Sequence, residues 1–267
     1  ARLLDETRAE ERAMDLLRSA PSTGSLTALK RAQETLERAV VERAAPDWRA
    51  RVFELAEALY QSIRMQLSVA RYKAIAVGRG ANLDTIDYPL NSRPWLIQQF
   101  DAIRAIDSEA GRQARIAEIA DWTNPGPGGF YDDLGNPGRQ PHLVRGAENG
   151  VVAASFALPG APRSSFSLAE TLFDAPLQMR YTELDPAAQY KVRVVYGMEQ
   201  PGAQVKLVAG DKYEVHPLIK KELRPMEFDI PREATAGGDI TLTWTQAPGS
   251  RGSGRGTQVA EVWLMRK

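Results

Sequence analysis

Oxygen-bearing side chains gather in one short segment near the middle of the chain. Residues 124–141 read NPGPGGFYDDLGNPGRQP, and Asp132, Asp133 and Asn136 lie there around Gly135. Carboxylate and amide oxygens are the ligands that a hard cation such as Ca²⁺ prefers. A run so rich in Pro and Gly cannot continue a helix or fit inside a sheet. The segment is therefore predicted to be a linker that can hold a cation.

A second group of polar residues, at 82–91, offers acid/base chemistry. Asp84 and Asp87 lie close together there, with Arg93 just beyond. Two such carboxylates can act as a general acid and base on a glycosidic bond, or bind a sugar. Asp also serves in caps and turns, and an ion pair between Arg93 and Asp87 would lock the loop, so both interpretations stay open. Neighbours in sequence seldom supply both carboxylates at the separation that glycoside cleavage requires.

The sequence contains few residues that could support other kinds of catalysis. The chain has no Cys, and its two His residues, His142 and His216, are far apart in sequence. Disulfides, thiolate nucleophiles and Cys-based zinc sites are excluded, and a His-based metal site or triad has little to draw on. Phosphate-binding loops, dinucleotide fingerprints and a Gly-x-Ser-x-Gly elbow do not occur. We expect this chain alone not to be an enzyme, with carboxylate-dependent cleavage as the enzymatic alternative.

The composition is that of an ordinary globular protein. Of the 267 residues, 43% are hydrophobic and 25% charged, which is enough for two domains with their own cores. The 34 basic and 34 acidic residues cancel, so neither nucleic acid nor an anionic membrane is the expected partner. No apolar run approaches the ~20 residues of a membrane span, and no signal peptide is expected. The start at Ala1 fits a mature product or the C-terminal part of a longer protein.

The first half has the apolar periodicity of helices. Apolar residues recur every three or four positions, with Ser25 as a start signal and Pro46-Asp47 as a break. The predicted helices are 2–19, 25–45, 48–77, 93–106 and 108–122. Together they predict a helical bundle over 1–123.

The second half changes to a period of two. Apolar and polar residues alternate at 177–181, 190–196, 205–207, 226–230, 240–244 and 259–264, with turn residues between the runs. Short strands at this spacing predict an antiparallel β-sandwich. The chain is therefore expected to be α+β with two domains: a helical bundle at 1–123, a linker at 124–141 and a β-sandwich at 142–267.

Several segments of the second half, in their order along the chain, resemble a known family. They are FYDDLG at 130–135, YTELDP at 181–186, YKVRV at 190–194, FDIP at 228–231 and QVAEVWL at 258–264. The order is similar to that in galactose-binding-like jelly-roll modules of bacterial extracellular polysaccharide-processing proteins. The resemblance implies a jelly roll, carbohydrate binding and an extracellular or periplasmic location. It covers the second half only, and the helical half resembles no family with a named activity.

The resemblance also implies a structural Ca²⁺, because such modules often hold one where the entering segment meets the last strand. Asp132, Asp133 and Asn136 would supply ligands, and Glu261 on the last strand would complete the sphere. The alternative is that Asp133 forms an Asx-turn and Glu261 pairs with an Arg at the surface.

Ligands of such sandwiches usually bind at loops on one end, where a sugar ring stacks on an aromatic residue. The loop 246–256 contains Arg251 and Arg255 and follows Trp244, and Tyr213 and His216 are expected to face the same rim. In the alternative interpretation the Gly-, Ser- and Arg-rich loop is simply mobile, and Trp244, which has the inward phase of its strand, belongs to the core.

Three functions fit these patterns. The first is an accessory carbohydrate-binding or docking region that acts with a catalytic domain or subunit and binds a saccharide or polysaccharide. The second is a carboxylate-dependent glycoside hydrolase or lyase with Asp84 or Asp87 in a site between the two halves. The third is a structural assembly subunit in which the long helix at 48–77 packs on another chain.

Overall fold

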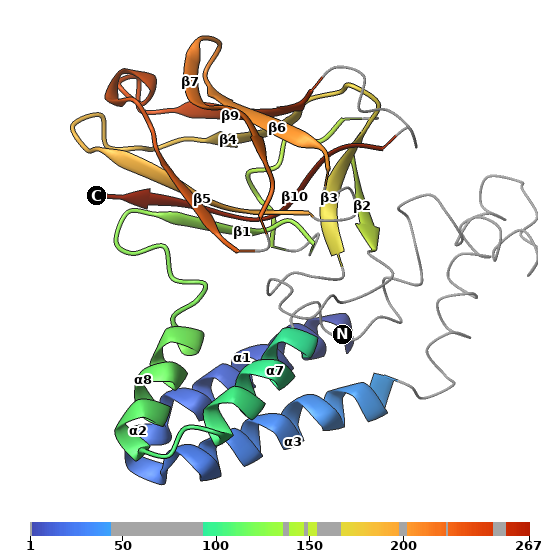
Figure 1. Cartoon of the computed structure of the whole chain (residues 1–267), viewed down its shortest axis with the longest axis vertical. Coiled ribbons are helices and arrows are strands. Elements are labelled where there is room, and N and C mark those ends of the chain that lie inside the picture. The colour runs from blue at the N-terminus through green and yellow to red at the C-terminus, as the bar shows by residue number, and fades with distance from the viewer. Residues whose placement is uncertain are drawn as a thin grey trace, which may run out of the picture. The chain divides into compact units, whose positions relative to one another are not determined.

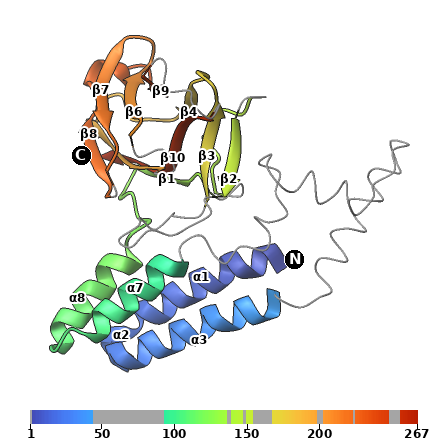
Figure 2. The same ribbon diagram turned by 45° about the vertical axis from the view of Figure 1, so that its right-hand side comes forward.

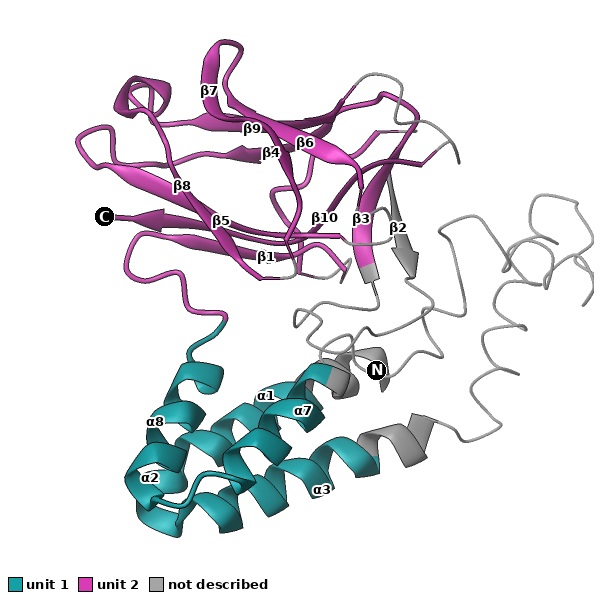
Figure 3. Ribbon diagram, in the orientation of Figure 1, with its two compact units in different colours: residues 1–122 teal, residues 123–267 magenta. Residues whose placement is uncertain are grey.

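The computed structural model describes residues 2–43, 93–135, 139–146, 149–153, 167–197, 202–222, 224–247 and 255–267. They belong to two compact units, 1–122 and 123–267 (Figure 3). Unit 1 is helical and unit 2 consists of antiparallel sheets, so the chain is α+β as predicted. The predicted helix at 48–77 and the residues Asp84 and Asp87 lie outside the described residues. None of the described helices is long and apolar enough to cross a membrane.

Unit 1 contains α1 (Arg2–Arg18), α2 (Ala20–Thr23), α3 (Ser25–Arg43), α7 (Arg93–Arg104) and α8 (Glu109–Ala120). Figures 1 and 2 both show α1, α3 and α7 side by side. The apolar stripes seen in the sequence meet in one core, because residues three and four apart share a helix face. This core comprises Ala13, Leu17, Ala20, Ala28, Leu29, Ala32, Leu36, Trp95, Leu96, Phe100, Ile103, Ile116 and Ile119.

The sequence predicted a helix end where α2 forms. Pro21 lies in the first turn of this short helix, where its missing N–H costs no hydrogen bond. Gly24 then separates α2 from α3 with a φ of 83°, a backbone conformation that residues with a Cβ rarely adopt. The helix therefore restarts at Ser25, as the sequence indicated.

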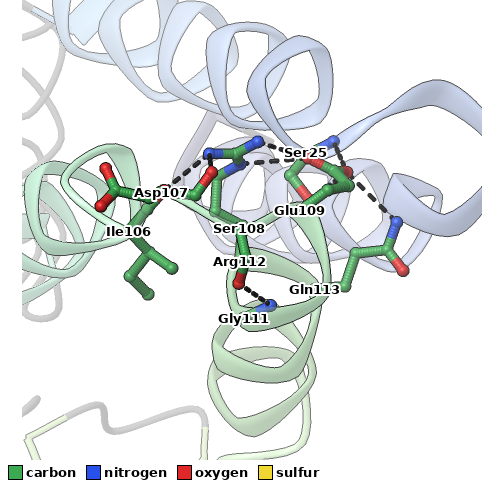
Figure 4. A network of polar contacts seen from close by, with 8 residues as sticks. All are labelled: Ser25, Ile106, Asp107, Ser108, Glu109, Gly111, Arg112 and Gln113. Carbon is green, nitrogen blue, oxygen red and sulfur yellow. Dashed lines mark hydrogen bonds and ion pairs between the residues drawn. The ribbon is translucent and has the colours of Figure 1, made fainter.

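Glu109, the first residue of α8, joins the beginnings of α8 and α3 (Figure 4). Its Oε1 accepts hydrogen bonds from the Ser25 backbone N–H at 2.8 Å, Ser25 Oγ at 2.7 Å and Gln113 Nε2 at 3.1 Å. Its Oε2 accepts one from Arg112 Nε at 3.0 Å. The first N–H groups of a helix have no partner within it, so the carboxylate caps α3 from another helix. These hydrogen bonds, led by that of the Ser25 N–H, lower the pKa of Glu109 to about 2.

The turn before α8 is held by two further contacts (Figure 4). Ser108 caps α8, because its Oγ accepts a hydrogen bond from the Gly111 N–H at 3.1 Å. Arg112 Nη1 reaches back to donate to the Ile106 carbonyl at 2.6 Å. The guanidinium thus fixes both the turn and the Glu109 carboxylate.

Unit 2 is a β-sandwich of two antiparallel sheets, one over the other in Figure 1. Sheet A has the order β2-β3-β10-β5-β8, with β1 also paired to β10, and sheet B has the order β4-β9-β6-β7. The bounds are β1 Phe130–Asp133, β2 Asn149–Ala153, β3 Ser167–Leu172, β4 Leu177–Tyr181, β5 Tyr190–Tyr196, β6 Gln204–Ala209, β7 Tyr213–Lys220, β8 Met226–Asp229, β9 Ile240–Gln246 and β10 Arg255–Arg266.

One core fills the space between the sheets. Alternate residues of each strand point inward, as the period of two predicted. Val192, Val194 and Val262 enter the core from sheet A, and Leu207 and Leu242 enter it from sheet B. All six predicted strands are present, β10 being longer than predicted at its N-terminal end.

The predicted linker contains a strand of sheet A. β1, at 130–133, pairs with β10 from Phe130↔Leu264 to Asp133↔Glu261. Residues 139–144 then carry the chain across to sheet B: Arg139 bonds through its backbone to Asp133, and 142–144 bond to the β4 backbone at 178–180. The edge of β4 is thereby covered.

We predict that Glu109→Gln destabilises unit 1, because an amide holds the Ser25 N–H and the Arg112 guanidinium more weakly than a carboxylate does. The pKa of Glu109 is lowered from 4.5 to about 2, so its contribution is complete above about pH 4.5 and is lost as the pH falls toward 2. Chemical denaturation followed by circular dichroism should place the variant's midpoint below that of the wild type at neutral pH, with the gap closing in acid.

Glu118→Gln is the matched control, since Glu118 lies on the same helix and pairs with Arg115 at the surface. Its midpoint should stay close to that of the wild type. A Glu109→Gln gap that is the same at neutral and acid pH would contradict the capping role.

Candidate functional site

The surface where β3 and β10 pair carries polar and aromatic residues suited to binding a ligand. Arg255 pairs with Leu172 and Gln258 with Glu170, whereas Ala169 and Val259 belong to the core. Since side chains alternate along a strand, the first four residues face away from the core. With two neighbours they form a group that we name the β3–β10 site: Glu170, Leu172, Phe173, Lys221, Arg255 and Gln258.

Gly256 lets β10 approach β3 closely at this site. A Cβ at this position would lie 2.5 Å from Thr171 Oγ1 and 2.8 Å from the Phe173 carbonyl oxygen. The Thr257 N–H donates to the same Thr171 hydroxyl at 3.0 Å. The register of β10 shifts just after Arg255, as in a β-bulge. Only glycine permits this contact without a backbone shift, and the contact sets the position of Arg255.

Glu170 is an almost fully buried carboxylate, with 3% of its surface exposed. Its Oε1 accepts a hydrogen bond from Gln258 Nε2 at 2.5 Å. Its Oε2 lies 3.9 Å from Arg255 Nε, which is an ion-pair distance but too long for a hydrogen bond. Burial raises the pKa of Glu170, and the Gln258 bond and the charges of Arg255 and Lys221 act against that rise.

Lys221 places a second cation near Glu170. Only 7% of its surface is exposed, and its Nζ donates to the Gly197 carbonyl oxygen at 2.7 Å. Burial lowers the pKa of Lys221 to about 8, and the charge of Glu170 opposes this. At neutral pH the ammonium is mostly protonated, so it offsets the buried carboxylate.

Phe173 holds an aromatic ring out into solvent. Its exposed fraction, 61%, is the largest among the large hydrophobic residues in the described part of the chain, and that of Leu172 is 45%. Its φ of 53° lies in the left-handed region, which a bulky residue rarely adopts. An exposed aromatic ring can stack on the apolar face of a sugar. Apolar periodicity could not indicate Phe173, because this residue follows the last residue of β3.

The residues predicted to form a binding rim do not lie together. Arg255 lies in the β3–β10 site, and Arg251 lies outside the described residues. Gln246, whose side chain bonds the Gly256 carbonyl, lies opposite the N-terminal end of β6. Tyr213 lies at the C-terminal end of β6, away from this region. Ligand binding by Arg255 stays a prediction. Tyr213 cannot belong to the same site as Arg255, because the two residues are separated by the length of β6.

Trp244 and His216 belong to a hydrogen-bonded chain inside the sandwich. Trp244 Nε1 donates to Tyr196 Oη at 3.2 Å, and Tyr196 Oη lies 2.6 Å from His216 Nε2. His216 Nδ1 lies 2.8 Å from the Pro217 carbonyl, so Nδ1 carries the proton and Nε2 accepts from the Tyr196 hydroxyl. Trp244 is 0% and His216 3% exposed, so neither ring presents a face to a ligand. Burial lowers the pKa of His216 and raises that of Tyr196.

The predicted calcium ligands are divided between the two faces of sheet A. Asp133 and Glu261 lie opposite each other on the outer face, whereas Asp132 points into the core, where it meets Tyr181. Consecutive strand residues point to opposite faces, so Asp132 and Asp133 cannot both direct their carboxylates at one ion. Asn136 lies outside the described residues, within which no group of three or more His, Asp or Glu could hold a metal ion. Calcium binding stays a prediction. Of the predicted ligands, the fold brings together the carboxylates of Asp133 and Glu261.

These two carboxylates also take part in ordinary structural contacts. Asp133 Oδ1 accepts a hydrogen bond from the Gly135 N–H at 3.1 Å, which is the alternative Asx-turn. Glu261 is fully buried, and its Oε1 accepts a hydrogen bond from Tyr131 Oη at 2.6 Å. Burial and the charges of Glu261 and Asp133 raise the pKa of Tyr131, and the charge of Arg139 lowers it. A side-chain cation therefore stands near the carboxylate pair.

Asp132 holds His142, an arrangement that the sequence did not reveal. The fully buried carboxylate lies 2.9 Å from His142 Nδ1 and accepts a hydrogen bond from Tyr181 Oη at 3.1 Å. The His142 ring stacks on Tyr181, with the ring centroids 4.4 Å apart. Because the three residues come from β1, the segment 139–144 and β4, Asp132 ties the two sheets together at this edge.

No protein-family model matches the sequence, and no curated protein is significantly similar to it. Among solved structures, the plant receptor-like kinase FER is 12% identical, with a TM-score of 0.40 over 52% of this chain and 42% of that one. The ANXUR1 extracellular domain from Arabidopsis thaliana is 13% identical, with a TM-score of 0.37 and coverages of 52% and 48%.

An exo-β-1,3-galactanase from Phanerochaete chrysosporium is 11% identical, with a TM-score of 0.32 over 52% of this chain and 29% of that one. Each match thus spans less than half of the solved chain. Similarity at this level identifies neither a ligand nor an activity.

We predict that Asp132→Asn destabilises unit 2 by about 2 to 4 kcal/mol, because the carboxylate accepts from the His142 backbone N–H at Oδ1 and from Tyr181 Oη at Oδ2, whereas an amide has only one acceptor oxygen. Urea denaturation measures the loss. Asp239→Asn is the control, since Asp239 pairs with Arg180 at the exposed surface and should cost less than about 1 kcal/mol. If Asp132→Asn and Asp239→Asn lowered the free energy of unfolding equally, the structural role assigned to Asp132 would be wrong.

We predict that His216 makes unit 2 less stable in mild acid. Burial lowers its pKa below the ordinary 6.5, so the unfolded chain binds a proton first and stability falls as the pH drops from about 6.5 through the lowered pKa. His216→Gln should be less stable at about pH 7.5 by about 1 to 2 kcal/mol, from lost hydrogen bonds. By about pH 5.5 the difference should shrink.

The measurement is the free energy of unfolding of both proteins across this pH range. His142 is present in both, so its titration cancels in the difference. A difference that does not change with pH would contradict the assignment to His216.

Proposed function

We propose that unit 2 binds a saccharide at the β3–β10 site. The observations that support this are the exposed ring of Phe173, which follows the Leu172 that pairs with Arg255, and the ion pair of Arg255 with the buried Glu170. The carbon-bound hydrogens of a pyranose ring pack on an aromatic face, and charged groups at its edge bond the hydroxyls. Burial of Glu170 and the close approach at Gly256 hold the polar groups in place before a ligand arrives.

The finer assignment follows from the resemblance in the second half of the sequence. Unit 2 would be a galactose-binding-like jelly roll, and the chain an accessory region of an extracellular polysaccharide-processing protein that acts with a catalytic domain or subunit. A structural Ca²⁺ at Asp133 and Glu261 belongs to the same proposal. The glycoside hydrolase or lyase alternative depends on Asp84 and Asp87, and the assembly alternative on the helix at 48–77. Both regions lie outside the described residues.

We predict that Phe173→Ala and Arg255→Gln each weaken saccharide binding by about ten-fold or more, because each removes a principal contact of the site. Calorimetric titration of the full chain with a panel of neutral and acidic oligosaccharides measures the affinity. Leu218→Ala is the matched control, since Leu218 is an exposed apolar residue on β7 in the other sheet.

The control should bind as the wild type does. If no member of the panel binds at millimolar concentration, or if Phe173→Ala and Arg255→Gln bind like the control, the proposed function is wrong.

A further inference from the structure

The connection from β3 to β4 projects into solvent at the β3–β10 site. Leu172, Phe173, Asp174 and Pro176 are all exposed, and Phe173 has 61% of its surface open to solvent. Less than half of this residue is therefore covered by the rest of the protein. A pocket that captures a small ligand encloses most of the ligand surface between its walls. A ring exposed to this extent instead offers an open contact surface.

The backbone that carries this ring is held in place. The Ala175 N–H donates to the Leu172 carbonyl oxygen at 3.1 Å and closes the turn. The Phe173 carbonyl oxygen lies against β10 at Gly256, where a Cβ would approach it to 2.8 Å. The left-handed φ of Phe173 persists because the surrounding structure fixes it. The ring therefore starts from a fixed point of the backbone before a ligand arrives, which lowers the entropic cost of binding.

We propose that the saccharide bound at the β3–β10 site is an internal unit of a polysaccharide chain, with further units continuing from it on both sides. This rests on the proposed function, and it names the class of ligand. The site then recognises a polymer along its length rather than at its ends.

An open surface suits an internal unit because it leaves room for the rest of the chain. Stacking on an aromatic ring covers one face of a pyranose, and the glycosidic bonds leave from its edges. Units on both sides can therefore continue past Phe173 without entering the protein. Recognition of a terminal unit needs polar groups that surround the end of the chain, as in an enclosing pocket.

Leu172 adds apolar surface for a neighbouring unit. It precedes Phe173, pairs with Arg255 across the two strands and has 45% of its surface exposed. A sugar unit that packs its carbon-bound hydrogens on this side chain removes apolar area from water. One unit stacked on Phe173 and the next on Leu172 bury more of this area than a single sugar does. Affinity should therefore rise from a simple glycoside to an oligosaccharide.

Recognition of internal units also sets how many proteins bind to one chain. A long chain contains many internal positions but one end of each kind. The number of proteins bound per chain, and the affinity per chain, should therefore increase with chain length. Both would stay constant beyond the first few units if an end were recognised.

The test is calorimetric titration of the full chain. Galactan, xylan, mannan, glucan and polygalacturonic acid are titrated first, and then a graded series of oligosaccharides from whichever polymer binds. The stoichiometry should rise from one protein per short oligosaccharide to several per long one. Phe173→Ala should lose about ten-fold or more in affinity at every length, and Phe173→Tyr, which keeps the ring, should bind as the wild type does. Leu218→Ala, at an exposed apolar residue on β7, is the control and should bind normally.

A second measurement uses the wild type alone. One long oligosaccharide is prepared with its reducing end reduced to the alditol, and another with the hydroxyls of its non-reducing end methylated. Each change should alter the affinity by less than about two-fold, whereas the loss of a recognised end costs about ten-fold or more.

One protein per chain at every length, or a ten-fold loss on altering one end, would overturn the inference. If Phe173→Ala also loses binding in that case, the proposed function stands, because the ring still holds a sugar at the end of a chain. If no polymer or oligosaccharide binds, or if Phe173→Ala binds as Leu218→Ala does, the inference and the proposed function are both wrong.

Discussion

The backbone pairing of β10 is the interaction on which unit 2 depends. This strand, Arg255–Arg266, pairs with β3 near its start, with β5 along its length and with β1 near its end. It is buried from Gly256 to Met265, so both of its faces are covered. The β3–β10 site lies at one end of it and the pair Asp133–Glu261 toward the other. A shift of β10 by one residue would exchange its two faces, and would remove both groups together with the core.

Unit 2 buries several ionic groups, most of them on strands of sheet A. Glu170, Lys221 and Glu261 each have less than a tenth of their surface exposed, as does Asp132 on the inner face. Charges in such places are tolerated only where other groups bond or balance them. Asp132 and Glu261 bond to His142 and to Tyr131, which makes them structural ties. Glu170 accepts a hydrogen bond from Gln258 and forms an ion pair with Arg255.

The sequence predicted which helices and strands form better than it predicted where they begin and end or which residues pair between them. The helices of unit 1 and six strands of unit 2 follow from apolar periodicity, because a one-sided core imposes the same period on every regular element. β1 was assigned to a linker, since the Pro and Gly residues on both sides of 130–133 hide a four-residue strand. The hydrogen bond between Glu109 and Ser25 joins residues far apart in the chain, so no local sequence pattern predicts it.

The sequence by itself determined the α+β class, the change of period between the halves, and the inward phase of Trp244. Each of these is a local property, fixed by side-chain type and spacing. Only the tertiary structure decided which polar residues meet. It separated Asp132 from Asp133 because a strand alternates its faces, and it placed Tyr213 and Arg255 at opposite ends of β6. It brought Leu172 and Arg255 together across β3 and β10, since pairing between distant strands depends on the register of the whole sheet.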